Sequence, residues 1–388
     1  MHPIIIIGSG FAGYTLAREF RKLDSSSPLI IITSDDGRSY PKPMLSNALS
    51  KGKTAEQLAL SSSEAIAKTL NITILNNSIV SDIDPQQQTV TITNVTPLHY
   101  KHLILALGAT PIRNVLEGNA TDDVMPINNL SDYTKFREQL VNANHVAIIG
   151  PGLIGCEFAN DLINTGIAVS VIGPSKLPMQ GLLPKPIATE LKTTLSNAGV
   201  DWHFQSTVTT VNHATTKNKN SYELTLSNGD LIQADVVISA IGLCPNIQLA
   251  KTIGITVNRG IVTDEYLQAS LPNIYALGDC AEVAGHNLLF IAPILAAAKA
   301  LAKTLSGQTT AVKYPAMPVA IKTPNYPLIV ATPALLAKGS WQFESASSGF
   351  GIKAVFTNDS AALLGFVLSG DMVSEKQVLT KLLPDILA

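Results

Sequence analysis

The chain has 388 residues, of which 46% are apolar and 14% charged, with 26 glycines and 22 prolines. This length predicts two or three domains, and the composition is that of an ordered globular protein with many turns, which excludes a disordered chain. The formal net charge of −2, without long runs of like charge, gives no indication of nucleic-acid binding or of a polybasic membrane anchor.

The three cysteines, Cys156, Cys244 and Cys280, are widely spaced. An odd number without a C-x-x-C pair argues against a disulfide framework, a dithiol relay and a four-cysteine cluster, so we expect no metal site and a reducing, cytoplasmic location. The apolar N-terminus lacks a basic segment, and the apolar run 290–305 is too short to span a bilayer. We therefore expect neither a signal peptide nor membrane insertion.

The first glycine motif follows a short apolar strand, residues 3–7, and precedes a helical pattern and a second strand at 29–33. Unpaired N–H groups at such a helix start bind the phosphates of a dinucleotide, and only glycine lets the backbone come close enough. An acidic residue about 20 positions later usually holds the ribose. In this chain the usual position of that acid, directly after Thr33, is occupied by Ser34. Asp35 or Asp36 can supply the acidic side chain instead, one step further along the chain. The motif reads Gly8-Ser9-Gly10-Phe11-Ala12-Gly13.

The same pattern returns 142 residues later, between a strand at 145–149 and a strand at 168–172, and it reads Gly150-Pro151-Gly152-Leu153-Ile154-Gly155. The repeat predicts a duplicated dinucleotide-binding fold. After the second strand there is neither an acid nor an arginine, and only Lys176 is near. Because a basic pair for a 2′-phosphate is missing, the residues favour NADH over NADPH, but they do not settle which coenzyme is used.

The rest of the chain completes these two units and adds a third. Strands are expected at 72–75, 89–93, 102–107 and 234–241, and an apolar helix begins near Ile291. From about residue 312 the pattern changes to short strands with many turns and a final helix, for which Ser374 and Gln377 form a capping box. The predicted fold class is α/β, with two Rossmann-like domains and a small α+β C-terminal domain.

These motifs resemble the two-dinucleotide-binding flavoprotein reductases over essentially the whole chain. Besides the two glycine motifs, the resemblance rests on the closing strand 106–111, on Glu157 and on the segment 273–279. It implies a glutathione-reductase-like architecture in which residues 1–112 with 241–312 bind FAD, residues 113–240 bind NAD(P)H, and residues 313–388 form the third domain.

Within that group the chain is most similar to the rubredoxin reductases, on the segments 35–45, 155–161 and 321–324. This similarity implies an enzyme that oxidises NADH and passes electrons one at a time to rubredoxin, a small acidic carrier that commonly supplies an alkane hydroxylase. Flavin can accept a hydride and release single electrons, which is why such a cofactor is needed.

The resemblance also implies roles for single residues. Asp279 binds the ribitol of FAD, Lys42 lies beside the flavin N5 edge, and Lys322 reaches the pyrimidine side of the ring. Glu157, in the first turn of its helix, either pairs with Lys42 or contacts the nicotinamide. A purely structural role remains open for each of them. Asp279 could be a turn residue, and Lys42 and Lys322 could be ordinary surface lysines. Glu157 could be an acid that the helix dipole favours.

Two apolar residues complete the FAD site that the resemblance implies. Val80 lies where backbone groups of the family meet the adenine, and Ile291 stands at the start of the apolar helix that follows Asp279. The alternative for Val80 is a residue of the core.

Three other functions remain open. The chain could be a ferredoxin or flavorubredoxin reductase of the same architecture, an NADH oxidase or peroxidase, or a flavin-binding signalling protein. The oxidases use a cysteine beside the flavin, and residues 40–49 contain none. An acidic partner requires a local basic patch, for which Lys42, Lys299, Lys303 and Lys322 are candidates.

Overall fold

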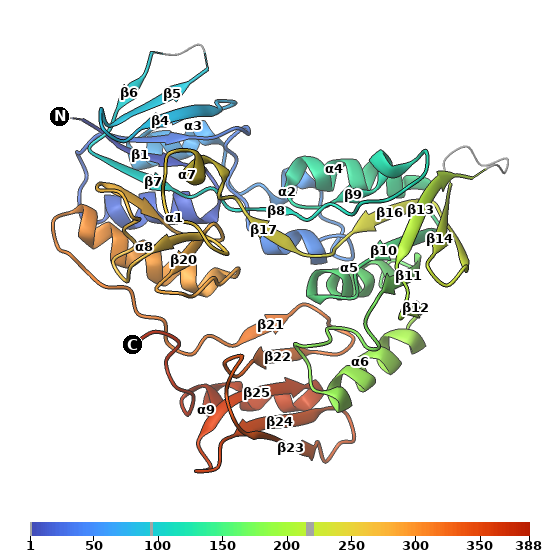
Figure 1. Ribbon diagram of the computed structural model, residues 1–388. Coiled ribbons are helices and arrows are strands. Elements are labelled where there is room, and N and C mark those ends of the chain that lie inside the picture. Colours follow the sequence, from blue (N-terminus) through green and yellow to red (C-terminus); the bar gives the residue numbers. More distant parts are fainter. Residues whose placement is uncertain (1, 94–95, 215–220) are drawn as a thin grey trace.

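The computed structural model describes residues 2–93, 96–214 and 221–388 (Figure 1). Two parallel sheets of five strands form two Rossmann-like units, and an antiparallel sheet of five strands forms a third unit below them in the view. Within the described ranges, no helix is both long and apolar enough to cross a membrane. The α/β class and the C-terminal domain expected from the sequence are confirmed.

The first sheet is built from apolar strands that are buried on both faces, as parallel strands covered by helices are. Its strand order is β19-β7-β1-β2-β3, and every pair is parallel. An antiparallel group, β4-β5-β6, accompanies it. The strands are β1 (Ile4–Ile7), β2 (Leu29–Ile32), β3 (Thr73–Leu75), β4 (Val80–Asp84), β5 (Thr89–Ile92), β6 (Leu98–His99), β7 (His102–Leu105) and β19 (Ile274–Ala276), and the helices of this unit are α1 (Phe11–Arg21), α3 (Ser63–Leu70), α7 (Gln248–Thr252) and α8 (Ile291–Leu305).

The second unit repeats the first. Its sheet has the order β12-β11-β10-β16-β9, again all parallel, with an antiparallel group β13-β14-β15 beside it. Its elements are β9 (Met125–Pro126), β10 (His145–Ile149), β11 (Ala168–Gly173), β12 (Val200–Phe204), β13 (Val208–His213), β14 (Tyr222–Leu226), β15 (Leu231–Ala234), β16 (Val236–Ser239), α4 (Leu130–Gln139), α5 (Leu153–Ile163) and α6 (Lys185–Asn197). The duplication that the two glycine motifs predict is therefore present in the strand order as well.

Short elements join the units. The two crossings between them pair as an antiparallel ribbon of β8 (Ala109–Pro111) and β17 (Leu243–Pro245). Smaller elements of the connecting segments are η1 (Lys42–Asn47), α2 (Ala55–Leu58), η2 (Thr121–Asp123), η3 (Leu140–Asn142), β18 (Ile261–Thr263) and β20 (Ala281–Val283).

The third unit is an antiparallel sheet of order β21-β22-β25-β24-β23. Its elements are β21 (Val319–Ile321), β22 (Leu328–Ala331), β23 (Ser340–Ser345), β24 (Ile352–Thr357), β25 (Leu363–Ser369), η4 (Gly370–Glu375) and α9 (Lys376–Thr380). The capping box expected at Ser374 and Gln377 is wrong, because Ser374 lies inside the 3₁₀ turn η4 and its hydroxyl donates to the carbonyl of Asp371. The chain then returns to the first unit, where Leu387 pairs with Tyr314.

The third glycine of each motif is required by packing. A Cβ on Gly155 would lie 1.9 Å from the carbonyl oxygen of Gly150, whereas a Cβ on Gly152 would meet no heavy atom within 4 Å. We expect Gly155→Ala to lower the stability of the protein by about 2–3 kcal/mol through overpacking. Gly152→Ala should cost less than about 1 kcal/mol. A thermal melt of the two variants checks this, and equal melting temperatures would contradict the packing role.

Candidate functional site

The two glycine turns leave the starts of α1 and α5 open. Gly8 and Gly150 have φ values of +116° and +115°, in the region that favours glycine. Gly10 and Gly152 cap the two helices without a side-chain hydrogen bond, and neither first turn contains an acid. The unpaired N–H groups and the positive end of each helix dipole are thus available to an anion such as a pyrophosphate.

A cavity of about 540 Å³ lies where the three units meet. The volume is in the range of pockets that bind drug-sized ligands and cofactors. Residues of both glycine motifs line it, as do residues of α8, β16 and β21. The cavity therefore joins the C-terminal ends of the strands in the two sheets, the place where nucleotides bind in open α/β folds.

Eleven of the residues expected from the sequence lie in the wall of this cavity: Ser9, Gly10, Phe11, Ala12, Lys42, Leu153, Ile154, Glu157, Asp279, Ile291 and Lys322. The structure does not place the other eight in the wall: Gly8, Gly13, Thr33, Ser34, Val80, Gly150, Gly152 and Gly155. Most of these are the glycines and neighbours that shape the turns behind the wall.

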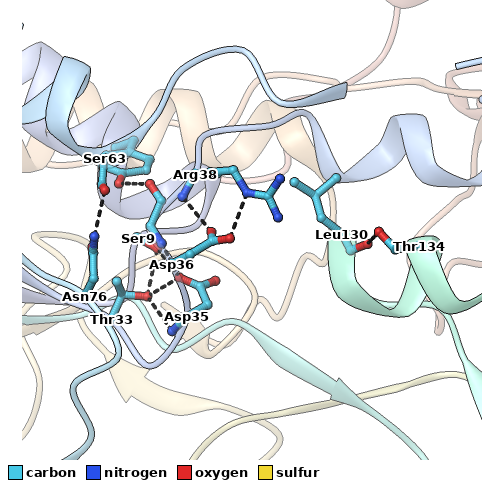
Figure 2. A network of polar contacts seen from close by, with 11 residues as sticks. Ser9, Thr33, Asp35, Asp36, Arg38, Ser63, Asn76, Leu130 and Thr134 are labelled. Atoms are coloured by element: carbon cyan, nitrogen blue, oxygen red, sulfur yellow. Dashed lines mark hydrogen bonds and ion pairs between the residues drawn. The ribbon is translucent and has the colours of Figure 1, made fainter. Parts of the chain in front are cut away.

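The polar contacts after β2 are organised around Asp35, not Ser34. The Asp35 carboxylate accepts from the hydroxyl of Thr33 at 2.6 Å and from that of Ser9 at 3.1 Å (Figure 2). It also accepts from the backbone N–H of Gly37 at 3.0 Å. Asp35 lines the cavity, whereas Ser34 is exposed outside it. Of the positions that the sequence offered for the ribose-binding acid, position 35 and not position 34 has its side chain in the cavity wall.

Asp36 does not share that position. It pairs with Arg38, whose Nε lies 2.7 Å from its carboxylate on the exposed side of the loop (Figure 2). This leaves Asp35 as the acidic side chain on the cavity at the end of β2.

Lys42 and Asp279 both line the cavity. Burial lowers the pKa of the Lys42 ammonium, an effect that the charge of Asp279 opposes, and burial raises the pKa of the Asp279 carboxyl, an effect that Lys42 opposes. The two groups are therefore close enough for each to stabilise the charge of the other. A half-buried cation and carboxylate on the same cavity wall fit the polar edge of a flavin and its ribitol.

Glu157 is the most deeply buried acid of the site, with 1% of its surface exposed. The ammonium of Lys322 lies 2.6 Å from one carboxylate oxygen, and the hydroxyl of Ser46 donates to the same oxygen at 2.6 Å. The backbone N–H of Lys322 donates to the other oxygen at 2.9 Å. The carboxylate is thereby held from two distant segments of the chain.

These contacts correct two expectations. Glu157 does not pair with Lys42 among the described ion pairs, because Lys322 and Ser46 occupy its carboxylate. It also lies beyond the first turn of α5, which begins at Leu153 and has no acid in that turn. The helix dipole therefore does not explain it, and Ser46 is a site residue that sequence reasoning missed, 111 positions away in the chain.

The third unit is fastened beside Glu157 by neighbouring residues of one loop. The side-chain oxygen of Asn160 accepts from the backbone N–H of Asn325 at 3.2 Å, and its amide donates to the side chain of Asn325 at 3.2 Å. The hydroxyl of Tyr326 donates to Glu190 on α6 at 2.5 Å. The position of Lys322 against Glu157 is thus fixed by the whole loop.

Two further observations bear on the chemistry. Cys156 and Cys280 are fully buried, and burial raises the pKa of both thiols, that of Cys280 to about 12, so they pack as neutral thiols. No cysteine is among the described residues that line the cavity. The hydroxyl of Ser239, at the end of β16, is buried in the cavity wall without a hydrogen-bond partner, which leaves it available to a bound ligand.

The open glycine turns, the opposite charges of Lys42 and Asp279 in the cavity wall and the two-motif cavity together fit an FAD and a nicotinamide dinucleotide. The first motif, Asp35, Lys42 and Asp279 would hold the flavin nucleotide, and the second motif with Glu157 and Ser239 would hold the nicotinamide nucleotide.

Known proteins match this chain over its full length. Residues 2–310 match the pyridine nucleotide-disulphide oxidoreductase family, and residues 311–383 match the rubredoxin binding C-terminal domain. The rubredoxin-NAD(+) reductase of Alcanivorax borkumensis is 44% identical over 387 residues, covering all of both chains. That of Acinetobacter baylyi is 45% identical over 393 residues, covering 100% of this chain and 99% of the relative.

A solved structure shows the same fold. The reductase–partner complex described as the covalent putidaredoxin reductase–putidaredoxin complex matches with a TM-score of 0.88 at 24% identity, over 99% of this chain and 94% of that chain.

The ion pair at Glu157 generates a first prediction for this site. Lys322→Met leaves a buried carboxylate without its cation, and we expect a loss of about 3 kcal/mol in stability. The double variant Glu157→Gln, Lys322→Met removes both charges and should recover part of that loss. Thermal melts of wild type, the two single variants and the double variant complete the cycle. Additive effects would mean that the two side chains do not interact.

The raised pKa of Asp279 generates a second prediction. Because the folded state holds this proton more tightly than the unfolded state, the contribution of Asp279 to stability is greatest below about pH 4 and is lost as the pH rises. Asp279→Asn should therefore gain stability over wild type between pH 4.5 and pH 7. Urea unfolding of the flavin-free proteins measures it, with exposed Asp82→Asn as control. A difference that does not change with pH would contradict the burial effect.

Proposed function

The chain belongs to the pyridine nucleotide-disulphide oxidoreductase family, and from that membership we propose that it is an NADH-dependent flavoprotein reductase that passes electrons one at a time to rubredoxin. The observation that carries the proposal is the single cavity lined by both glycine motifs, because it lets two dinucleotides meet at their reactive ends. The match of residues 311–383 to a rubredoxin binding domain supports the acceptor.

Bound FAD supplies the step between two-electron and one-electron chemistry. The overall reaction oxidises one NADH to NAD⁺, reduces two rubredoxins by one electron each and releases one proton. Lys42 contributes positive charge where negative charge develops on reduction. Asp279 binds the ribitol hydroxyls, and Asp35 binds the ribose of the adenosine.

The second unit orients the coenzyme. Leu153 and Ile154 present the apolar start of α5 to the cavity, and Ser239 offers its free hydroxyl at the end of β16. The carboxylate of Glu157 pairs with the ammonium of Lys322 and so positions that ammonium at the cavity wall. With no acid or arginine after β11 and only the exposed Lys176 near, the unit lacks the basic pair that holds a 2′-phosphate, which supports NADH as the donor.

The cellular setting is part of the proposal. All three cysteines are free, as in a reducing compartment, which supports the cytoplasm. The similarity to rubredoxin reductases extends the proposal to an alkane hydroxylase as the consumer of the electrons.

We expect Lys42→Met to slow the reduction of bound FAD by NADH at least about tenfold, because it removes the cation that stabilises the reduced ring. Stopped-flow bleaching of the flavin absorbance measures this rate. Lys101→Met is the matched control, since Lys101 is exposed and precedes β7 at the opposite end of the first sheet. An unchanged rate in Lys42→Met would remove this residue from the reaction.

The acceptor is tested separately by steady-state NADH oxidation with rubredoxin, ferredoxin or oxygen. Fast turnover with rubredoxin supports the proposal. Flavin reduction by NADH without rubredoxin turnover would leave the family and the cofactors in place and overturn the acceptor, and turnover with none of the three would favour a signalling role.

A further inference from the structure

The charges of the chain are unevenly distributed around the cavity. Residues 283–343, the acid-free segment, contain five lysines and no aspartate or glutamate. Because the whole chain has a formal net charge of −2, the remaining residues carry −7. The acid-free segment includes α8, β21 and β22, and Figure 1 shows α8 at the lower edge of the first unit and β21 at the upper edge of the third.

One face of α8 continues the cavity onto the surface. Leu295, Lys299 and Lys303 are spaced four residues apart, so they lie on the same side of the helix, and we call them the α8 stripe. Leu295 lines the cavity and is 40% exposed, and both lysines are exposed. By the helix rise, Lys299 and Lys303 stand about 6 and 12 Å further along the axis from the cavity rim.

The fold gives no reason for this arrangement. Neither lysine of the α8 stripe forms an ion pair within the described part of the chain. Like charges at i and i+4 destabilise a helix by about 0.2–0.5 kcal/mol. The helix dipole favours Lys303 in the last turn, but Lys299 lies in the middle of α8 and gains nothing from it.

We propose that the α8 stripe is the docking surface for the acidic one-electron carrier, a proposal that rests on the function proposed above. Leu295 forms the apolar contact at the rim, where the wall of the flavin cavity reaches the surface. Lys299 and Lys303 attract the acidic carrier to that rim against the negative charge of the remaining chain. Lys322 does not share this role, because Glu157 neutralises it.

The rival surface lies on the third unit. Leu335 and Leu336 are 98% and 90% exposed, and they belong to the segment that matches the rubredoxin binding domain. An apolar contact there predicts a different dependence on salt, since burial of leucine is not screened by ions.

The test is the double variant Lys299→Glu, Lys303→Glu of the FAD-loaded full chain. We expect its kcat/KM for rubredoxin to fall about tenfold at low salt and to lose most of its dependence on ionic strength. Lys68→Glu, Lys251→Glu is the matched control, with the same charge change on exposed residues of α3 and α7 outside the cavity wall. Turnover of NADH with a small neutral quinone should be unchanged in both variants.

Each outcome decides between the surfaces. A loss confined to rubredoxin in the α8 variant, with the control and the quinone activity intact, supports the α8 stripe. Two outcomes overturn the α8 stripe and leave the proposed function standing. The first is an equal loss of rubredoxin turnover in the α8 variant and in the lysine control. The second is no loss in the α8 variant while Leu335→Ser, Leu336→Ser loses rubredoxin turnover. Wild-type protein that turns over quinone but no rubredoxin overturns both.

Discussion

The buried carboxylate of Glu157 is the interaction on which the site depends. A charge with 1% exposure is tolerated only when it is paired and hydrogen-bonded, and here the partners come from η1 and from the start of the third unit. The burial of this carboxylate therefore requires α5, η1 and the start of the third unit to pack together. Their meeting closes the cavity between the two nucleotide units.

The duplicated unit explains why there is a cavity to close. Each parallel sheet ends in a glycine turn that leaves a helix start free, and both open edges point to the same space. The antiparallel ribbon of β8 and β17 links the units at this edge. Residues of both glycine motifs thereby line the same cavity.

Lysines and acids are unevenly distributed along the chain around the cavity. The acid-free segment supplies the flavin-side rim through α8 and the Glu157 partner through Lys322, while the acids of the third unit begin only at Glu344, where Lys353 pairs with Glu344 and Glu375. A chain that is weakly acidic overall thus presents lysines beside the cavity, where we propose that the acidic electron carrier docks.

The sequence by itself determined the two nucleotide units, the cofactor class and the family, because glycine turns and apolar strands are local patterns with a direct physical meaning. It also placed Lys42, Asp279 and Lys322 at one site through resemblance. Only the tertiary structure decided which cation pairs with Glu157, that Ser46 joins it, and that Asp35 lies in the cavity wall while Ser34 and Asp36 do not. These contacts join residues as many as 165 positions apart, and such pairing is set by packing between units, which no local pattern records.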